Sequence, residues 1–133
     1  MLFGASAGAT ALAIYLLVTQ GLIAAPSPTA GPRNPFPPTA QSLAQGRTLY
    51  VTHCQSCHGV TGKGDGPAGV GLMPPPIDLT QHVGLHPEGE LFRMISQGVP
   101  RTAMPPFAGR LTEEERWHLV NYIRTFEATR SGG

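Results

Sequence analysis

Apolar and small side chains recur at helical spacing in the segment that follows residue 40. Leu43, Gly46, Tyr50 and Cys54 succeed one another at intervals of three or four residues, which places them on one face of a helix. The residues between them then face outward. The pattern therefore predicts a helix over residues 41–54 that ends at the first cysteine.

A second, shorter helix is predicted over residues 86–98, whose sequence is HPEGELFRMISQG. Pro87 suits the first turn of a helix, and Gly98 is a typical residue to end one. Leu91 and Ile95 lie four residues apart, so both side chains are expected to face the interior.

The clearest amphipathic pattern lies in residues 111–126. Thr112 and Glu115 have the spacing of a capping box, which predicts the start of a helix. Three helices joined by loops, without strands, indicate an all-α fold. The inward-facing stripe of this last helix comprises Leu119, Tyr122, Ile123 and Phe126.

The first 25 residues contain no charged side chain. A helix of that length rises about 37 Å at 1.5 Å per residue, which exceeds the roughly 30 Å of hydrocarbon in a bilayer. A cleavable signal peptide is the alternative, but it needs a positively charged start and a short apolar centre. The pattern therefore predicts one transmembrane helix over residues 1–25 that anchors the chain.

A proline-rich segment follows, with six prolines in residues 26–40. Such a composition is typical of an extended, semi-rigid linker. The predicted organisation is thus an anchor at 1–25, a linker at 26–40 and one domain at 41–130.

Composition narrows the function of this domain. Nine basic and eight acidic side chains leave a formal charge of +1, and Lys63 is the only lysine, which argues against nucleic acid as a partner. The 133 residues include 17 Gly and 14 Pro, so the chain has few side chains with which to build an apolar core. A large apolar cofactor would supply the missing core.

The only two cysteines, Cys54 and Cys57, are three residues apart and are followed directly by His58. A redox dithiol is disfavoured because the residues before Cys54 indicate a helix instead of a strand. A structural zinc site is disfavoured because it usually needs two such cysteine pairs. The sequence Cys-x-x-Cys-His is typical of covalent haem attachment, in which both thiols bond the haem and the histidine binds the iron.

With these motifs, residues 41–127 resemble the class I cytochromes c. The resemblance rests on CQSCH at 54–58, the glycine-rich loop after it, MPPPIDLT, GVPRTAMPPF and the aromatic Tyr122 in the last helix. It implies a cytochrome c fold around one haem c, bound through Cys54 and Cys57, with His58 as an iron ligand. It also implies that the first and last helices cross where a glycine, here Gly46, lets an aromatic residue approach.

The second iron ligand is a choice chiefly between Met73 and Met104, because each precedes prolines that would stiffen its loop. The chain from His58 to Met104 contains a whole helix and is long enough to reach the opposite face of the haem. The resemblance also implies Met104, and Met73 is then expected to contribute to the haem pocket. A histidine or an open iron position remains the alternative, and Met94 is interpreted as packing.

Further polar contacts to the haem follow from the same interpretation. A carbonyl of Pro75 or Pro76 is a candidate acceptor for the free ring N–H of His58. Trp117 and Arg101 are candidates to reach the haem carboxylates, with packing or exposure as the alternatives. The other histidines are expected to make local hydrogen bonds; they are His53, His82, His86 and His118.

The function implied by two protein ligands on the iron is one-electron transfer without catalysis of its own. A haem peroxidase or sensor with an open iron position is the enzymatic alternative, and a subunit that mainly holds a complex together is another. Anchored monohaem cytochromes of similar layout are subunits of respiratory or photosynthetic complexes such as alternative complex III. Partners are therefore expected to be the membrane and redox proteins, with no small-molecule substrate. The haem domain is expected on the periplasmic or outer face of the cytoplasmic membrane.

Overall fold

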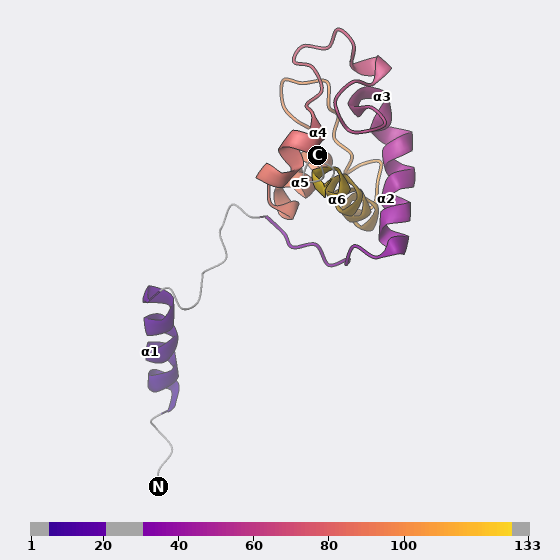
Figure 1. The fold of residues 1–133 in the computed structure, drawn as a ribbon. Helices are drawn as coiled ribbons and strands as arrows, with labels where there is room; N and C mark the ends of the chain where they lie inside the picture. Colours follow the sequence, from indigo (N-terminus) through magenta and orange to yellow (C-terminus); the bar gives the residue numbers. More distant parts are fainter. Residues whose placement is uncertain (1–5, 21–30, 129–133) are drawn as a thin grey trace.

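The computed structural model describes residues 6–20 and 31–128, and these residues form helices and loops without a strand (Figure 1). The all-α prediction is confirmed for this part of the chain. The helices, in chain order, are α1 (Ser6–Thr19), α2 (Ala40–His53), α3 (Gln55–His58), the 3₁₀ turn η1 (Pro67–Gly69), α4 (Leu79–His82), the 3₁₀ turn η2 (Val83–Leu85), α5 (Glu88–Gln97) and α6 (Glu113–Ala128).

The predicted transmembrane helix is wrong. Its described part is α1, which has 14 residues and is therefore about 21 Å long, against the roughly 30 Å of a bilayer's hydrocarbon core. Across residues 6–20 and 31–128, no helix combines the length and apolar character needed to span a membrane. The helix ends at Thr19, whose hydroxyl donates a hydrogen bond to the Leu16 carbonyl. Polar Gln20 follows, and the rest of the predicted span lies outside the described residues.

The three helices predicted for the domain are confirmed as α2, α5 and α6, with ends within two residues of those expected. The capping box of α6 is present, because the Thr112 amide donates to Glu115 and the Glu115 amide donates to the Thr112 hydroxyl. Gly98 ends α5 in the left-handed region, with φ of 70°. The short helices α3 and α4 were not predicted, since one helical turn carries no periodic signal.

Helices α2 and α6 cross in direct contact at Gly46. A Cβ atom on this glycine would lie 2.1 Å from the carbonyl oxygen of His118 and 2.7 Å from Cβ of Tyr122. No larger residue fits there without moving a helix. One turn further along α2, the Tyr50 ring packs against the rings of Tyr122 and Phe126, with centroids 5.4 and 5.2 Å away.

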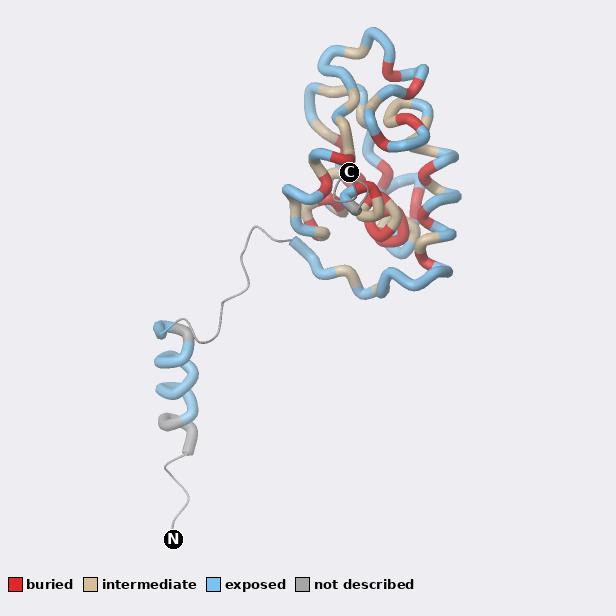
Figure 2. Tube along the Cα trace, in the orientation of Figure 1, coloured by how far each residue is buried: buried red, intermediate tan, exposed pale blue. Residues whose placement is uncertain are grey.

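The apolar core lies between these two helices and α5 (Figure 2). In Figure 2, α6 is largely buried while the described part of α1 is exposed. Trp117 is 1% exposed and stacks on Phe92 of α5, with ring centroids 4.0 Å apart. The buried apolar residues are Tyr50, Val83, Leu91, Ile95, Phe107, Leu111, Trp117, Leu119, Val120, Ile123 and Phe126.

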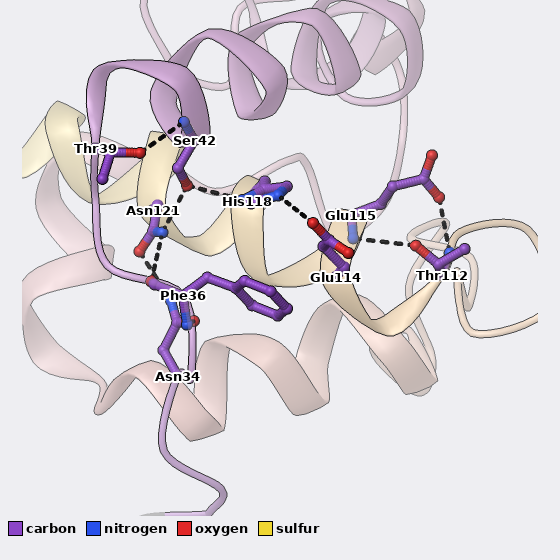
Figure 3. A network of polar contacts seen from close by, with 9 residues as sticks. All are labelled: Asn34, Phe36, Thr39, Ser42, Thr112, Glu114, Glu115, His118 and Asn121. Carbon is purple, nitrogen blue, oxygen red and sulfur yellow. Dashed lines mark hydrogen bonds and ion pairs between the residues drawn. The ribbon is translucent and has the colours of Figure 1, made fainter.

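Residues 31–39 of the predicted linker pack on the domain (Figures 1 and 3). The side-chain amide of Asn34 donates to Asn121 of α6, and the backbone N–H of Asn34 donates to the Glu88 carboxylate of α5, both at 2.8 Å. The Phe36 carbonyl accepts from Asn121, and the Phe36 ring lies 5.3 Å from that of His118. Residues 31–39 therefore form a strap that packs against α5 and α6, which their proline-rich composition alone does not predict.

A buried polar network continues from the strap to the surface (Figure 3). Asn121 donates to the Ser42 hydroxyl at 2.8 Å, and that hydroxyl lies 2.8 Å from Nδ1 of His118. Nε2 of His118 lies 3.3 Å from Glu114. A single assignment satisfies all three contacts: Nε2–H donates to Glu114, and Nδ1 accepts from Ser42. The network joins the start of α2 to α6.

We predict that Gly46→Ala destabilises the domain by about 1–3 kcal/mol, because the added methyl group must displace the His118 backbone. Urea unfolding followed by far-UV circular dichroism measures the change. Gly109→Ala is the matched control, since a Cβ atom on Gly109 meets nothing within 4 Å. Equal stability of the two variants would contradict the close crossing.

Candidate functional site

A cavity of about 260 Å³ opens between α3, α4, α5 and the loop that precedes α6. Its size is just below the ~300–1,000 Å³ typical of ligand pockets. The lining is mostly apolar, with Leu79, Leu91 and Ile95 among its residues. The structure brings all four predicted site residues to this cavity: Cys54, Cys57, His58 and Met104.

The two cysteines and His58 lie at the junction of α2 and α3. The Cys54 amide donates to the Tyr50 carbonyl as the last bond of α2, and the His58 amide donates to the Cys54 carbonyl as the bond of α3. Burial, and secondarily the neighbouring Cys57, raises the pKa of the Cys54 thiol to about 12. Both thiols are free and half-buried, and both line the cavity. The raised pKa keeps the Cys54 thiol neutral.

The glycine-rich loop folds back over this junction. The Gly64 amide donates to the His58 carbonyl at 2.8 Å, and the Gly66 amide donates to the Cys57 carbonyl at 3.1 Å. Gly64 has φ of 78°, and a Cβ atom there would lie 2.4 Å from the Pro76 carbonyl oxygen. Glycine therefore lets the proline segment approach the backbone of the histidine.

The His58 ring is held without a hydrogen bond at Nδ1, which is buried. Burial lowers the pKa of His58, and the backbone of Ile77 opposes this by favouring the protonated ring, although not through a bond of ordinary geometry. The expected bond to a carbonyl of Pro75 or Pro76 is not formed. A neutral ring is the form in which histidine binds a metal.

Met104, which also lines the cavity, lies in a tightly hydrogen-bonded loop. Its amide donates to the Thr102 hydroxyl at 3.1 Å, and its carbonyl accepts from the Val99 amide at 3.3 Å. The Thr102 hydroxyl in turn donates to the Val99 carbonyl at 2.8 Å. Threonine two residues before the methionine was not recognised in the sequence, although such short side-chain-to-backbone bonds are typical of this residue.

The other methionines are placed differently from expectation. Met73 is 87% exposed and does not line the cavity, so its predicted contribution to the pocket is wrong. The reason is that the proline segment after it packs toward the glycine-rich loop, with Pro76 near Gly64 and Gly69. Met94, interpreted as packing, does line the cavity.

Several polar residues also differ from expectation. Neither Trp117 nor Arg101 lines the cavity: Trp117 is buried against Phe92, and Arg101 is an exposed turn residue with φ of 63°. His82 makes a local hydrogen bond, as expected, and His86 lies beside the carboxylate of Glu90, yet both also line the cavity. The four-residue spacing of these two histidines is the sequence feature that could have indicated that they line the same site.

The arrangement fits a covalently attached haem. Two thiols, an imidazole and a thioether line one apolar cavity, and together they are the donor set of a His/Met haem site. The zinc interpretation finds no ligand set in residues 6–20 and 31–128, where no three His, Cys, Asp or Glu side chains gather as a metal site would require. Cys54, Cys57, His58 and Met104 are therefore the residues that could hold the cofactor.

Comparison with known proteins agrees with this chemistry. The family model described as cytochrome c oxidase, cbb3-type, subunit III matches residues 41–123. The matched region contains the whole cavity lining and most of α6.

The alignments with individual relatives cover different shares of those proteins. Cytochrome c-554(547) of Halothiobacillus neapolitanus is 33% identical over 91 residues, which are 66% of this chain and 100% of that protein. The thiosulfate dehydrogenase of Stutzerimonas stutzeri is 28% identical over 102 residues, 74% of this chain but 32% of the relative. A solved reducing HAO-like protein complex of Kuenenia stuttgartiensis aligns with a TM-score of 0.61 and 30% identity, over 76% of this chain and 50% of that one.

Asp78 positions the α4 wall of the cavity, and we predict that Asp78→Ala lowers the free energy of unfolding by about 1 kcal/mol at neutral pH. The Asp78 carboxylate accepts from the Thr80 hydroxyl at 2.6 Å and from the Thr80 amide at 2.9 Å. These bonds, led by the hydroxyl, hold the pKa of Asp78 below its ordinary value.

The pH dependence follows from the sign of that shift. Because the folded-state pKa is lowered, the contribution of Asp78 is full above its unfolded pKa of about 3.9 and is lost as the pH falls through the folded value. Urea unfolding at several pH values measures the difference from Asp78→Ala. Asp78→Asn keeps an acceptor oxygen and is expected to retain most of the stability at neutral pH; a loss equal to that of alanine would contradict the capping role.

Proposed function

The chain belongs to the family described as cytochrome c oxidase, cbb3-type, subunit III, and we propose that His58 and Met104 bind the iron of its haem c. The c-type cytochrome relatives support electron transfer by a haem c protein. One haem c would be attached through Cys54 and Cys57. The observation that carries the proposal is the single cavity lined by all four residues.

Two protein ligands would leave the iron no position for a substrate, so the proposed activity is one-electron transfer. When bound, the haem supplies an iron that accepts and releases one electron. The thioether of Met104 favours the reduced state and raises the potential, within the roughly 0.8 V over which axial ligands act. The Met104 amide donates to the Thr102 hydroxyl and the Met104 carbonyl accepts from the Val99 amide, and these bonds fix the backbone from which the sulfur extends.

The partners we propose are redox proteins in a larger electron-transfer assembly. The relatives include a thiosulfate dehydrogenase and a chain of an HAO-like complex, and this chain spans only 32% and 50% of them. The shared region is thus one domain of a longer redox protein in those cases. A respiratory or photosynthetic complex, of which alternative complex III is one kind, is the proposed setting. The periplasmic or outer face of the cytoplasmic membrane is the proposed location, because thioether attachment of haem takes place there.

An enzyme or sensor with an open iron position is the competing function, and it would require Met104 to leave the iron. The bonded loop around Met104 supports a fixed ligand instead. Val99, Thr102 and Met104 are tied to one another, and the next residues are anchored to α5 because the Phe107 amide donates to the Ile95 carbonyl at 3.0 Å.

We predict that haem stays with the polypeptide through a denaturing gel, because thioether bonds survive unfolding. Haem-dependent peroxidase staining of the gel measures this. Cys54→Ala and Cys57→Ala are each expected to lose most of the covalent haem, whereas Ser56→Ala, between them in the same motif, is expected to keep it. Complete extraction of haem from the unmodified protein by acidified organic solvent would contradict covalent attachment.

We predict that Met104→Ala removes the weak sulfur-to-iron charge-transfer absorbance of the oxidised protein, lowers the reduction potential, and lets the ferrous iron bind carbon monoxide rapidly. Visible spectroscopy and potentiometry measure these changes. Met73→Ala is the matched control, since Met73 is exposed and away from the cavity. The ligand assignment is wrong if Met73→Ala has these effects and Met104→Ala does not.

A further inference from the structure

The cavity lacks fixed positive charge. Among the described residues that line it there is no lysine and no arginine; the side chains with basic nitrogens are four histidines, His53, His58, His82 and His86. A haem carries two carboxylate arms, and a carboxylate that enters an apolar cavity must find a donor or a positive charge. The three histidines other than His58 are therefore the available partners.

The attachment chemistry selects two of these three. The vinyl groups that bond to cysteines and the two carboxylate arms lie on opposite edges of the haem. Cys54 and Cys57 would hold the vinyl edge, and His53 precedes Cys54 directly in the chain. His82 and His86 line the cavity from a different segment, at the end of α4 and just after η2.

We propose that His82 and His86 bind the carboxylate arms of the haem, each through Nε2 of a protonated ring. The proposal rests on the haem site proposed above. It explains why both half-buried rings line a cavity that has no lysine or arginine among its described lining residues.

The contacts already made by Nδ1 of each ring decide which nitrogen is available. Nδ1 of His82 lies 2.9 Å from the Asp78 carbonyl oxygen, and Nδ1 of His86 lies 3.1 Å from a carboxylate oxygen of Glu90. Both partners can only accept, so Nδ1 carries the hydrogen in each ring. Nε2 of a neutral ring then has only a lone pair, which repels a carboxylate. Protonation turns Nε2 into a donor.

Charged groups of both signs lie near these two rings. Glu90 of α5 faces His86, and the Asp78 carboxylate, with Lys63 near it, lies at the start of the helix that carries His82. Arg124 of α6 donates to the Val83 carbonyl at 2.8 Å and to the His86 carbonyl at 2.5 Å. Glu127 of α6 pairs with Arg124 at 3.4 Å. The guanidinium is thus engaged by the backbone of η2 and does not line the cavity.

The consequence is a coupling between reduction of the haem and proton uptake by the two histidines. Reduction adds one electron from the redox partner, so His82 and His86 hold a proton more tightly in the reduced protein and take up as much as one proton each from water. Linkage requires the converse, that loss of those protons lowers the reduction potential. Histidine side chains change charge between roughly pH 5 and 8. The potential is therefore expected to fall as the pH rises through that interval.

Spectroelectrochemical titration of the haem-loaded full chain between pH 5 and 8 tests the proposal. The unmodified protein is expected to show the falling potential, His82→Gln and His86→Gln a shallower fall each, and the double variant a flat profile. His53→Gln is the matched control and should keep the slope of the unmodified protein. A flat profile in the unmodified protein, or an unchanged slope in the double variant, overturns the proposal.

A second variant covers the case in which a histidine substitution prevents folding or haem loading. Glu90→Gln leaves His86 in place but removes the negative charge that favours its protonation, so the fall in potential should move to lower pH. An unmoved profile in Glu90→Gln counts against His86. Failure of the proposed haem site is a separate outcome, because it would show as absent covalent haem or an open-iron spectrum before any titration.

Discussion

The close contact of α2 and α6 at Gly46 is the constraint on which the position of the cysteine motif depends. Because this glycine has no side chain, the helices meet at backbone distance, and the Tyr50 ring can pack against the rings of Tyr122 and Phe126. The next turn of α2 ends at the first cysteine. Cys54 lies only two helical turns beyond the crossing, so the crossing closely determines the position of this cysteine.

The glycine-rich loop depends on that framework because none of its apolar side chains belongs to the buried core. The Tyr50 hydroxyl, inside the core, donates to the Gly59 carbonyl at 2.7 Å, and the Leu79 amide donates to the Gly62 carbonyl at 2.7 Å. These bonds tie the start of the glycine-rich loop to α2 and α4. The loop of Met104 is held to α5, because the Phe107 and Ala108 amides donate to the carbonyls of Ile95 and Ser96.

The sequence allowed the three long helices to be predicted, because periodicity and capping are local signals, and the CQSCH motif and Met104 singled out residues that the fold brings to one cavity. It failed where local composition admits two outcomes. An uncharged apolar segment suggested a membrane span, yet its described helix stops at Thr19. Met73 and Met104 have similar proline neighbours, and only the fold places one in the cavity and leaves the other exposed. Asn34 and Phe36 gave no signal, because their partners in α6 are more than eighty residues away.

The two halves of the domain differ in what stabilises them, and this explains why a glycine- and proline-rich chain can fold here. The buried apolar residues come from α2, η2, α5, α6 and the loop before α6, whereas the segment from α3 to α4 contributes none. In that segment Val60 and Val70 are 70% and 83% exposed. Backbone hydrogen bonds alone contribute little net stability, so this half has no core until the cavity beside it is filled. A large apolar cofactor bonded at Cys54 and Cys57 would bury the inner face of the segment against Leu79, Leu91 and Ile95, and thereby complete the core.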